Sequence, residues 1–152
     1  MDNLSFRRAG IDDLPAILTL LVDDEHGRSR EVVSDPPDPH YIAAFRAMEA
    51  DANQLPIVGV VGKRVVAYLQ LTVIPGLSRL GRTRGQLESV RVARDLRNQR
   101  IGRRLMEYAT KEARHRGCSL MQLTTDKTRP DAKRFYESLG FTASHEGMKR
   151  SI

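Results

Sequence analysis

From Leu87 to Leu105 the sequence reads LESVRVARDLRNQRIGRRL, and this stretch decides the fold. It begins with the alternating apolar residues of a strand, passes through a short basic turn and continues as a helix. The first turn of a helix has four N–H groups without partners inside the helix, and the helix dipole adds partial positive charge there. The stretch therefore predicts a phosphate site, to which arginines add positive charge at positions 97, 100, 103 and 104. The alternative is that these arginines only solvate an exposed helix start.

The helix that follows this turn is the clearest element in the chain. Its apolar residues recur at i, i+4, i+7, i+8 and i+12, the spacing of a one-sided helix, at Ile101, Leu105, Tyr108, Ala109 and Ala113. Arg116 and Gly117 close it, because glycine readily adopts the backbone conformation that ends helices. We therefore expect a helix over about 101–115 that packs one face on a sheet.

The rest of the chain supplies further strands and helices. Strands are predicted over 4–9, 56–61, 64–74, 86–93 and 118–125, with one or two closing strands within 141–152. Helices are predicted from Asp12 through a stripe at Leu14, Ile17, Leu18 and Leu21, then over 39–52 and from Pro130 to Gly140. Residues 27–39 and 77–85 read as connections, the second basic and mobile. This order predicts one α/β domain over 1–152, a mixed sheet covered by helices on both faces.

Length and composition restrict the class of protein. The chain has 152 residues, of which 40% are hydrophobic and 29% charged, as in a single globular domain. No run approaches the roughly 18 apolar residues of a membrane span, and no secretory signal begins the chain. The single cysteine, Cys118, cannot form an internal disulfide. We therefore expect a cytoplasmic protein without a membrane partner. Its formal charge of +6 attracts phosphates, either of nucleic acid or of a phosphorylated cofactor.

Two motifs resemble the GNAT superfamily of N-acetyltransferases. The family's phosphate-binding signature is Arg or Gln, two residues, Gly, one residue, then Gly or Ala, and the stretch RNQRIG at 97–102 fits it with one departure. The departure is Arg100, where the family usually has glycine. We expect helical backbone angles at Arg100, because only a positive φ would penalise its side chain, by roughly 1 kcal/mol. The second and more specific motif is RPDAKRFYESLGF at 129–141, which looks like the family's C-terminal Phe-Tyr helix followed by Leu-Gly-Phe.

The resemblance implies a GNAT-like acyl-CoA N-acyltransferase fold with acetyl-CoA as the acetyl donor and no metal. The pantetheine arm would lie in a splay between the strands over 86–93 and 118–125, paired with backbone groups near Val90 and Val92. The phosphates would lie against the turn and helix start, formed by Arg97, Asn98, Gln99, Arg100, Ile101, Gly102 and Arg103.

The resemblance also implies two catalytic residues. Tyr136 occupies the position of the family's usual general acid, where a phenol protonates the leaving thiolate. Glu88 occupies a position from which many members deprotonate the attacking amine, directly or through water. This step is needed because an amine of pKa about 10 is mostly protonated at pH 7. The alternatives are a core tyrosine whose hydroxyl is satisfied by a neighbour, and a surface or ion-paired glutamate.

Other reactive side chains carry weaker signals. Asp126 and Lys127 match only partly a family position that contacts the cofactor, so a structural role in a loop competes with cofactor binding. The run Asp23-Asp24-Glu25-His26 could suggest a metal site, but consecutive residues at a helix end rarely converge on one ion. Cys118 has no candidate base nearby in sequence, which argues against a nucleophilic thiol.

The sequence thus predicts an N-acetyltransferase that moves an acetyl group from acetyl-CoA to a primary amine by direct attack in a ternary complex. The acceptor is either a small amine or a peptide amine. Arg79, Arg82 and Arg84 favour an anionic acceptor, whereas the acidic run at 23–25 would suit a polyamine. The rivals are a non-catalytic acyl-CoA-binding sensor and a basic nucleic-acid-binding module, for which no helix-turn-helix, zinc pattern or aromatic platform is present. We expect no nucleic-acid partner, and the sequence leaves a homodimer open.

Overall fold

The computed structural model describes residues 3–24 and 26–152. Five strands form one mixed sheet in the order β1-β2-β3-β4-β5. Neighbouring strands are antiparallel except for the last pair, β4 and β5, which is parallel. The strands are β1 (Leu4–Arg8), β2 (Gln54–Val61), β3 (Arg64–Ile74), β4 (Arg84–Val92) and β5 (Leu120–Leu123).

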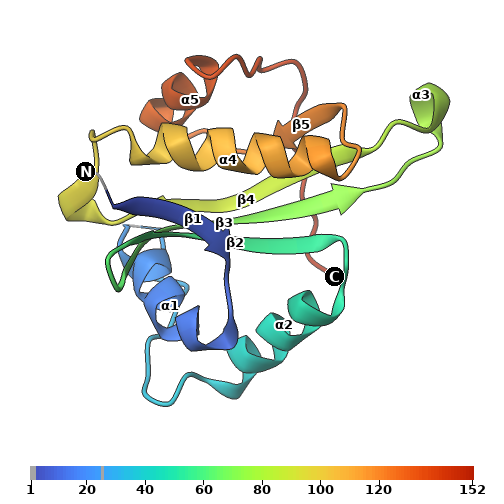
Figure 1. The fold of residues 1–152 in the computed structure, drawn as a ribbon. Helices are drawn as coiled ribbons and strands as arrows, with labels where there is room; N and C mark the ends of the chain where they lie inside the picture. Colours follow the sequence, from blue (N-terminus) through green and yellow to red (C-terminus); the bar gives the residue numbers. More distant parts are fainter. Residues whose placement is uncertain (1–2, 25) are drawn as a thin grey trace.

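Helices cover both faces of this sheet, with α1 and α2 on one side and α4 and α5 on the other (Figure 1). Their bounds are α1 (Leu14–Val22), α2 (Pro39–Ala50), α4 (Ile101–His115) and α5 (Pro130–Glu137). Two short 3-10 helices, η1 (Ile11–Asp13) and η2 (Arg94–Leu96), precede α1 and follow β4. The predicted fold class, an α/β mixed sheet between two helical layers, is confirmed.

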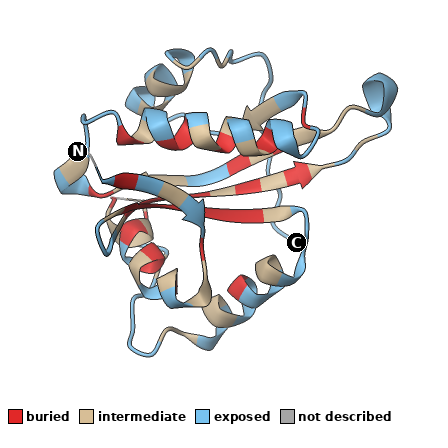
Figure 2. Ribbon diagram, viewed as in Figure 1, coloured by how far each residue is buried: buried red, intermediate tan, exposed pale blue. Residues whose placement is uncertain are grey.

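The core lies on both faces of the two central strands, where Figure 2 shows buried residues along β2, β3 and the inward side of α4. Ile57, Leu69 and Leu71 are fully buried. The predicted apolar stripe of α4 faces the sheet, since Ile101, Leu105, Ala109 and Ala113 are buried; Tyr108 is only half-buried, against Phe6. The N-terminus of α4 therefore packs beside the end of β4.

Two predicted features at the ends of elements differ from the structure. The closing strands expected within 141–152 are wrong, because this tail has no strand, and it passes beside Thr124 at Gly147 without joining the sheet. Few β-branched or aromatic residues follow Phe141, which leaves the tail little strand propensity. The strand predicted over 118–125 is shorter, at 120–123, because the Cys118 N–H bonds the carbonyl of Ala113 instead. β5 consequently offers β4 a neighbour over four residues only.

The connection predicted at 77–85 forms an arm that projects beyond the sheet (Figure 1). It contains the single turn α3 (Ser78–Gly81), in which Arg79 and Leu80 have positive φ angles of 55° and 59°. The side chains of Leu77 and Leu80 are fully exposed at its tip. β4 begins at Arg84, two residues earlier than predicted, so part of the expected basic connection belongs to the sheet.

Candidate active site

β4 has a free edge over its second half. β5 pairs with β4 only from Arg84 to Leu87, and no strand among the described residues lies beside the rest of β4 on that side. A bulge at Ser89, which has a φ of 55°, shifts the register of β4 against β3. A bulge bends its strand and increases the local twist. Because β5 ends at Leu123, opposite Leu87, β4 continues beyond it with an open edge, and we call the space beside this edge the splay.

The backbone of Val90 and Val92 faces this splay. The Ala93 N–H donates to a carbonyl of β3 at 2.8 Å, and hydrogen-bonding direction alternates along a strand, so Val92 and Val90 direct their groups the opposite way. The Val90 carbonyl accepts from Nη1 of Arg91 at 3.0 Å, and the Val92 carbonyl accepts from Nε of Arg97 at 3.2 Å. The edge therefore presents backbone carbonyls that the guanidinium groups of Arg91 and Arg97 contact.

The turn between η2 and α4 contains two residues with left-handed backbone angles. Asn98 has a φ of 63°, and Arg100, the residue before α4, has φ 61° and ψ 9°. The prediction of helical angles at Arg100 is wrong. The turn must reverse the chain within four residues to bring α4 back over the sheet, and a left-handed residue makes that reversal. The Arg100 carbonyl still accepts the Arg104 N–H at 3.1 Å, so the helix begins without a lost bond.

The turn and the start of α4 carry exposed polar side chains, namely those of Arg97, Asn98, Gln99, Arg100 and Arg103. Arg97 also donates through Nη2 to the carbonyl of Asp23 at 3.1 Å, and Arg103 donates to the Ser138 carbonyl at 3.4 Å. These contacts are peripheral and leave most guanidinium N–H donors open to solvent. The turn is thus a basic surface at the N-terminus of a 15-residue helix.

Ile101 and Gly102 have packing roles at the same place. The side chain of Ile101 is buried in the core, so only its backbone can face a ligand. A Cβ at Gly102 would lie 3.2 Å from Cζ of Phe135, tighter than ordinary van der Waals contact. Gly102 therefore allows α5 to pack closely on the first turn of α4.

Tyr136 lies on α5 and is half-buried. Its ring packs against Phe135 and Phe141, with ring centroids 5.3 and 6.0 Å away. Burial raises the pKa of the Tyr136 hydroxyl, and the nearby guanidinium groups of Arg129 and Arg91 partly oppose that rise. No residue in the described part of the chain hydrogen-bonds this hydroxyl, which differs from a core tyrosine satisfied by a neighbour.

Glu88 faces the side of the sheet covered by α1 and α2. It pairs in register with Gln70 of β3 and is exposed. Burial, followed by the negative charge of Glu88, raises the pKa of Tyr68 to about 12. Tyr68, Gln70 and Ser89 form the floor of a cavity of about 150 Å³ whose walls come from α1 and α2. Glu88 does not line this cavity itself, but its chain neighbour Ser89 and its cross-strand partner Gln70 do.

A buried ionic cluster lies near Tyr136, and the sequence did not predict it. Asp24 is only 8% exposed, and its Oδ2 lies 3.2 Å from Nη2 of Arg91 and 3.3 Å from Nη2 of Arg129. Its Oδ1 accepts the Gly27 N–H at 2.6 Å. A Cβ at Gly27 would lie 1.8 Å from the carbonyl oxygen of Leu21, so glycine is needed for the chain to fold back and turn Asp24 inward. The one feature of the sequence that could have indicated this cluster is Arg91, a charged residue between two valines of a predicted strand.

Charge and burial compete within this cluster. Burial alone would raise the pKa of Asp24, but the Gly27 N–H and the two guanidinium groups hold it below its usual value. Burial lowers the pKa of Arg91, Asp24 opposes that change, and the positive charges of Arg129 and Arg30 add to it. Nε of Arg91 is buried without a hydrogen-bond partner among the described residues. The cluster therefore carries more positive than negative charge.

The remaining polar candidates have local roles. Asp126 accepts from the backbone N–H and the hydroxyl of Thr128, which shapes the loop before α5, and Lys127 pairs with Glu146. His26 contacts Thr128 at 3.2 Å, while Glu25 lies outside the described residues. Within 3–24 and 26–152, no three His, Cys, Asp or Glu side chains gather as metal ligands, and no helix is long and apolar enough to cross a membrane.

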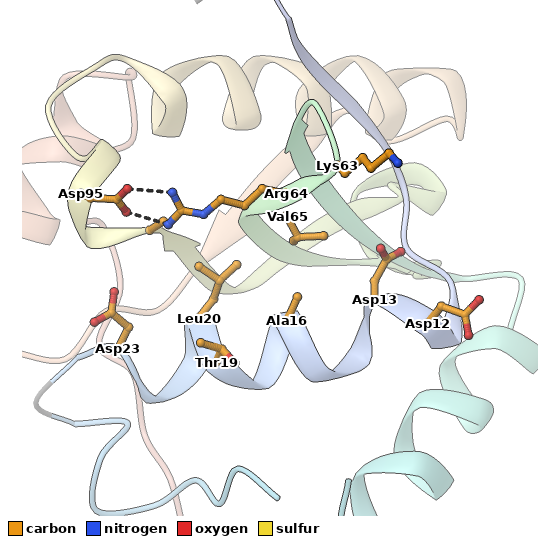
Figure 3. A pocket seen from close by; sticks show the side chains of 11 residues that line it. Asp12, Asp13, Ala16, Thr19, Leu20, Asp23, Lys63, Arg64, Val65 and Asp95 are labelled. Carbon is orange, nitrogen blue, oxygen red and sulfur yellow. Dashed lines mark hydrogen bonds and ion pairs between the residues drawn. The ribbon is translucent and has the colours of Figure 1, made fainter. Parts of the chain in front are cut away.

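A larger depression of about 440 Å³ lies beside α1, against the turn between β2 and β3 (Figure 3). Its lining contains four aspartates, but Asp95 forms two hydrogen bonds with Arg64, of 2.7 and 2.8 Å, and Asp13 pairs with Arg7. None of the predicted catalytic or cofactor residues lines it. The splay is therefore the better candidate for chemistry.

Comparisons with known proteins agree with this geometry. The family model described as the acetyltransferase (GNAT) family matches residues 15–141. An aminoalkylphosphonate N-acetyltransferase of Salmonella typhimurium is 39% identical over 68 residues, which span 45% of this chain and 44% of that enzyme. The match thus covers less than half of that relative.

Solved structures resemble the whole chain. A structure described as a transcriptional regulator from Bacillus halodurans C-125 is 44% identical with a TM-score of 0.95, and the match covers 98% of this chain and 99% of that one. A putative acetyltransferase from Agrobacterium tumefaciens is 27% identical with a TM-score of 0.85, covering 97% and 99%. Because the family model spans most of the sequence, the chain belongs to the acetyltransferase (GNAT) family.

Proposed function

We propose that this protein transfers an acetyl group from acetyl-CoA to a primary amine by direct attack in a ternary complex. One observation supports this most: the free edge of β4 at Val90 and Val92 runs from the basic turn at 97–103 to the neighbourhood of Tyr136 and Glu88. An extended thioester on this edge would place its phosphates and its acetyl group at opposite ends.

The residues present fit acetyl-CoA. Backbone N–H groups at the start of α4 and the exposed guanidinium groups of Arg97, Arg100 and Arg103 would hold the pyrophosphate. The carbonyls of Val90 and Val92 would accept from the amide groups of the pantetheine arm in place of Nη1 of Arg91 and Nε of Arg97. Side chains of Asn98 and Gln99 would border the phosphates, whereas Ile101 and Gly102 would contribute backbone only.

In the proposed reaction the amine nitrogen forms a bond to the acetyl carbon, and the bond from that carbon to sulfur breaks. Glu88 accepts the proton of the acceptor ammonium, directly or through water, from its exposed place beside the cavity. Tyr136 donates its hydroxyl proton to the leaving thiolate and regains a proton, through water, from the acceptor nitrogen as the amide forms. Its raised pKa keeps this hydroxyl protonated at neutral pH, as an acid requires. Backbone N–H groups of β4 stabilise the carbonyl oxygen as it gains charge.

The experiment is an acetylation assay with acetyl-CoA and a panel of small and peptide amines, with release of free thiol and the acetylated product both measured. We expect thiol release that depends on the amine. Binding of acetyl-CoA without turnover across the panel would instead favour the non-catalytic sensor. The name of the curated relative places an aminoalkylphosphonate in this panel.

Nucleic-acid binding is the second candidate, because the charge is +6 and one similar structure is described as a transcriptional regulator. Anisotropy with a labelled duplex at 50 and 200 mM salt tests it. We expect only the weak, steeply salt-dependent binding of any basic surface. Tight binding that persists at 200 mM salt would favour the regulator.

A further inference from the structure

The guanidinium of Arg91 occupies an unusual position for a strand residue. Its side chain is 13% exposed, points to the α1 and α2 side of β4 beside Tyr68, and lies three residues after Glu88. Its charge and that of Arg129 both act on the Tyr136 hydroxyl. Two arginines thus lie near the proposed acid, and one of them, Arg91, is on the same strand as the proposed base.

Asp24 does not use up the donors of these arginines. Both approach the same atom, Oδ2, while Oδ1 is occupied by the Gly27 N–H. Each guanidinium carries five N–H donors, and Nε of Arg91 is buried and unpartnered in the described part of the chain. Nη1 of Arg91 donates to the Val90 carbonyl, but the Arg129 side chain makes no hydrogen bond besides that to Asp24 in the described part of the chain, so donors remain for another anion beside Asp24.

The repulsion between the positive charges of the cluster also favours binding of an anion. Two guanidinium groups that share one carboxylate oxygen, with Arg30 near enough to add to the repulsion, form a costly arrangement for a partly buried site. A ligand that brings negative charge would relieve it. Arginine is also the residue best suited to planar, two-point recognition of a carboxylate or phosphonate.

We propose that Arg91 and Arg129 determine the acceptor, and that the substrate is a small primary amine bearing an oxyanion group, a carboxylate or a phosphonate, a few bonds from its nitrogen. This inference rests on the proposed N-acetyltransferase function and names the substrate class of the same site. The anion would bind the two guanidinium groups on the α1 and α2 side of β4, with the amine directed at the thioester in the splay. Asp24 would act as a positioning residue that orients both arginines.

The test compares four amines of similar size: 2-aminoethylphosphonate, β-alanine, propylamine and putrescine. We expect kcat/KM for at least one anionic amine to exceed that for propylamine by roughly 100-fold. The two anionic probes distinguish the tetrahedral phosphonate from the planar carboxylate, and a preference for either supports the proposal. Equal or better turnover of propylamine or putrescine would overturn it. Absence of thiol release with every amine would instead refute the proposed function itself.

Variants then locate the preference. Arg91→Met and Arg129→Met should each reduce the ratio of kcat/KM for the anionic amine to that for propylamine by roughly 10- to 100-fold. This ratio cancels the fraction of active protein, so partial unfolding of a variant does not affect it. Arg91→Lys should keep an intermediate ratio, because it retains the charge without the two-point fork. Arg114→Met, an exposed residue at the end of α4, is the matched control and should leave the ratio unchanged. If both arginine variants lower the two rates equally, Arg91 and Arg129 do not select the acceptor.

Discussion

The two groups of arginines that flank the splay differ in how they are held. The basic turn at 97–103 is local in sequence, exposed, and built on the N-terminus of α4. The cluster of Asp24, Arg91 and Arg129 is drawn from three distant segments, largely buried, and locked by a shared carboxylate oxygen. Exposed charges are weakened by salt and tolerate substitution, whereas buried charges respond strongly to the loss of any partner. The first group suits a ligand held by many weak contacts, and the second suits selection of one acceptor.

Tyr136→Phe tests the point where the two regions meet, and it has the largest expected effect. The variant keeps the ring packing against Phe135 and Phe141 and removes only the hydroxyl. We expect kcat to fall by roughly 10²- to 10³-fold while acetyl-CoA affinity changes little, because the acid acts only in the transition state. Single-turnover rates and cofactor titration measure the two quantities separately. Full activity in a folded variant would remove Tyr136 from the mechanism.

Asp24→Asn removes the negative charge from the buried cluster of Asp24, Arg91 and Arg129. Because two guanidinium groups would lose their counter-charge, we expect the free energy of unfolding to fall by about 3 kcal/mol in urea titrations. The matched control is Asp12→Asn, an exposed carboxylate, for which a change within about 0.5 kcal/mol is expected.

The same pair of variants predicts a pH dependence. The pKa of Asp24 is held below its ordinary value, so its contribution is present above about pH 4, the value in an unfolded chain, and is lost as the pH falls through the folded value. The difference between wild type and Asp24→Asn should therefore shrink at acid pH. A difference that stays constant down to pH 3 would show that Asp24 acts through packing.

Acetyl-CoA binding probes the exposed region. At a concentration about 100 times its dissociation constant, acetyl-CoA should stabilise the folded state by about 2.7 kcal/mol, seen as a higher melting temperature. Raising salt from 50 to 500 mM should reduce this gain, because the arginines at 97–103 are exposed. An unchanged melting temperature at millimolar acetyl-CoA would contradict the proposed site, and dephosphorylated analogues would show which phosphate matters.

Glu88→Gln separates a proton acceptor from a surface carboxylate. We expect turnover to fall at least about 10-fold at pH 7, with a larger loss at lower pH, where free amine is scarcest. A rate profile from pH 6 to 9 for the variant and the wild type measures this. Glu107→Gln, an exposed residue of α4, should leave the profile unaltered. Parallel profiles for Glu88→Gln and wild type would assign Glu88 a structural role.

Arg100→Gly has the smallest expected effect. Glycine removes the strain of a left-handed arginine, so we expect stability to change by less than about 1 kcal/mol, in the favourable direction. Arg103→Gly, inside α4, should instead destabilise by about 1 kcal/mol. Thermal or urea unfolding of the two variants compares them directly. Destabilisation by Arg100→Gly would mean that its side chain contributes more than its backbone strain costs.

Prediction from sequence succeeded where the information is local. The period of apolar residues over 101–115 specified α4 and its buried face, and two glycine-containing motifs specified the order of elements around it. It failed where a neighbour decides the outcome. The tail at 141–152 would need a long β5 beside it to become a strand, and β5 has four residues. Arg100 adopts a positive φ because of where α4 must lie, which its own residue type disfavours.

What the sequence by itself determined is the family, the mixed sheet between helices and the basic turn at the start of α4, since each follows from residues close together in the chain. Only the tertiary structure decided that Asp24, Arg91 and Arg129 meet beside Tyr136. These residues are separated by 67 and 38 positions along the chain (91 minus 24, 129 minus 91), and neither periodicity nor spacing relates them. They come together because the chain folds back at Gly27, close to Leu21, which turns the Asp24 carboxylate toward Arg91 of β4 and Arg129 before α5.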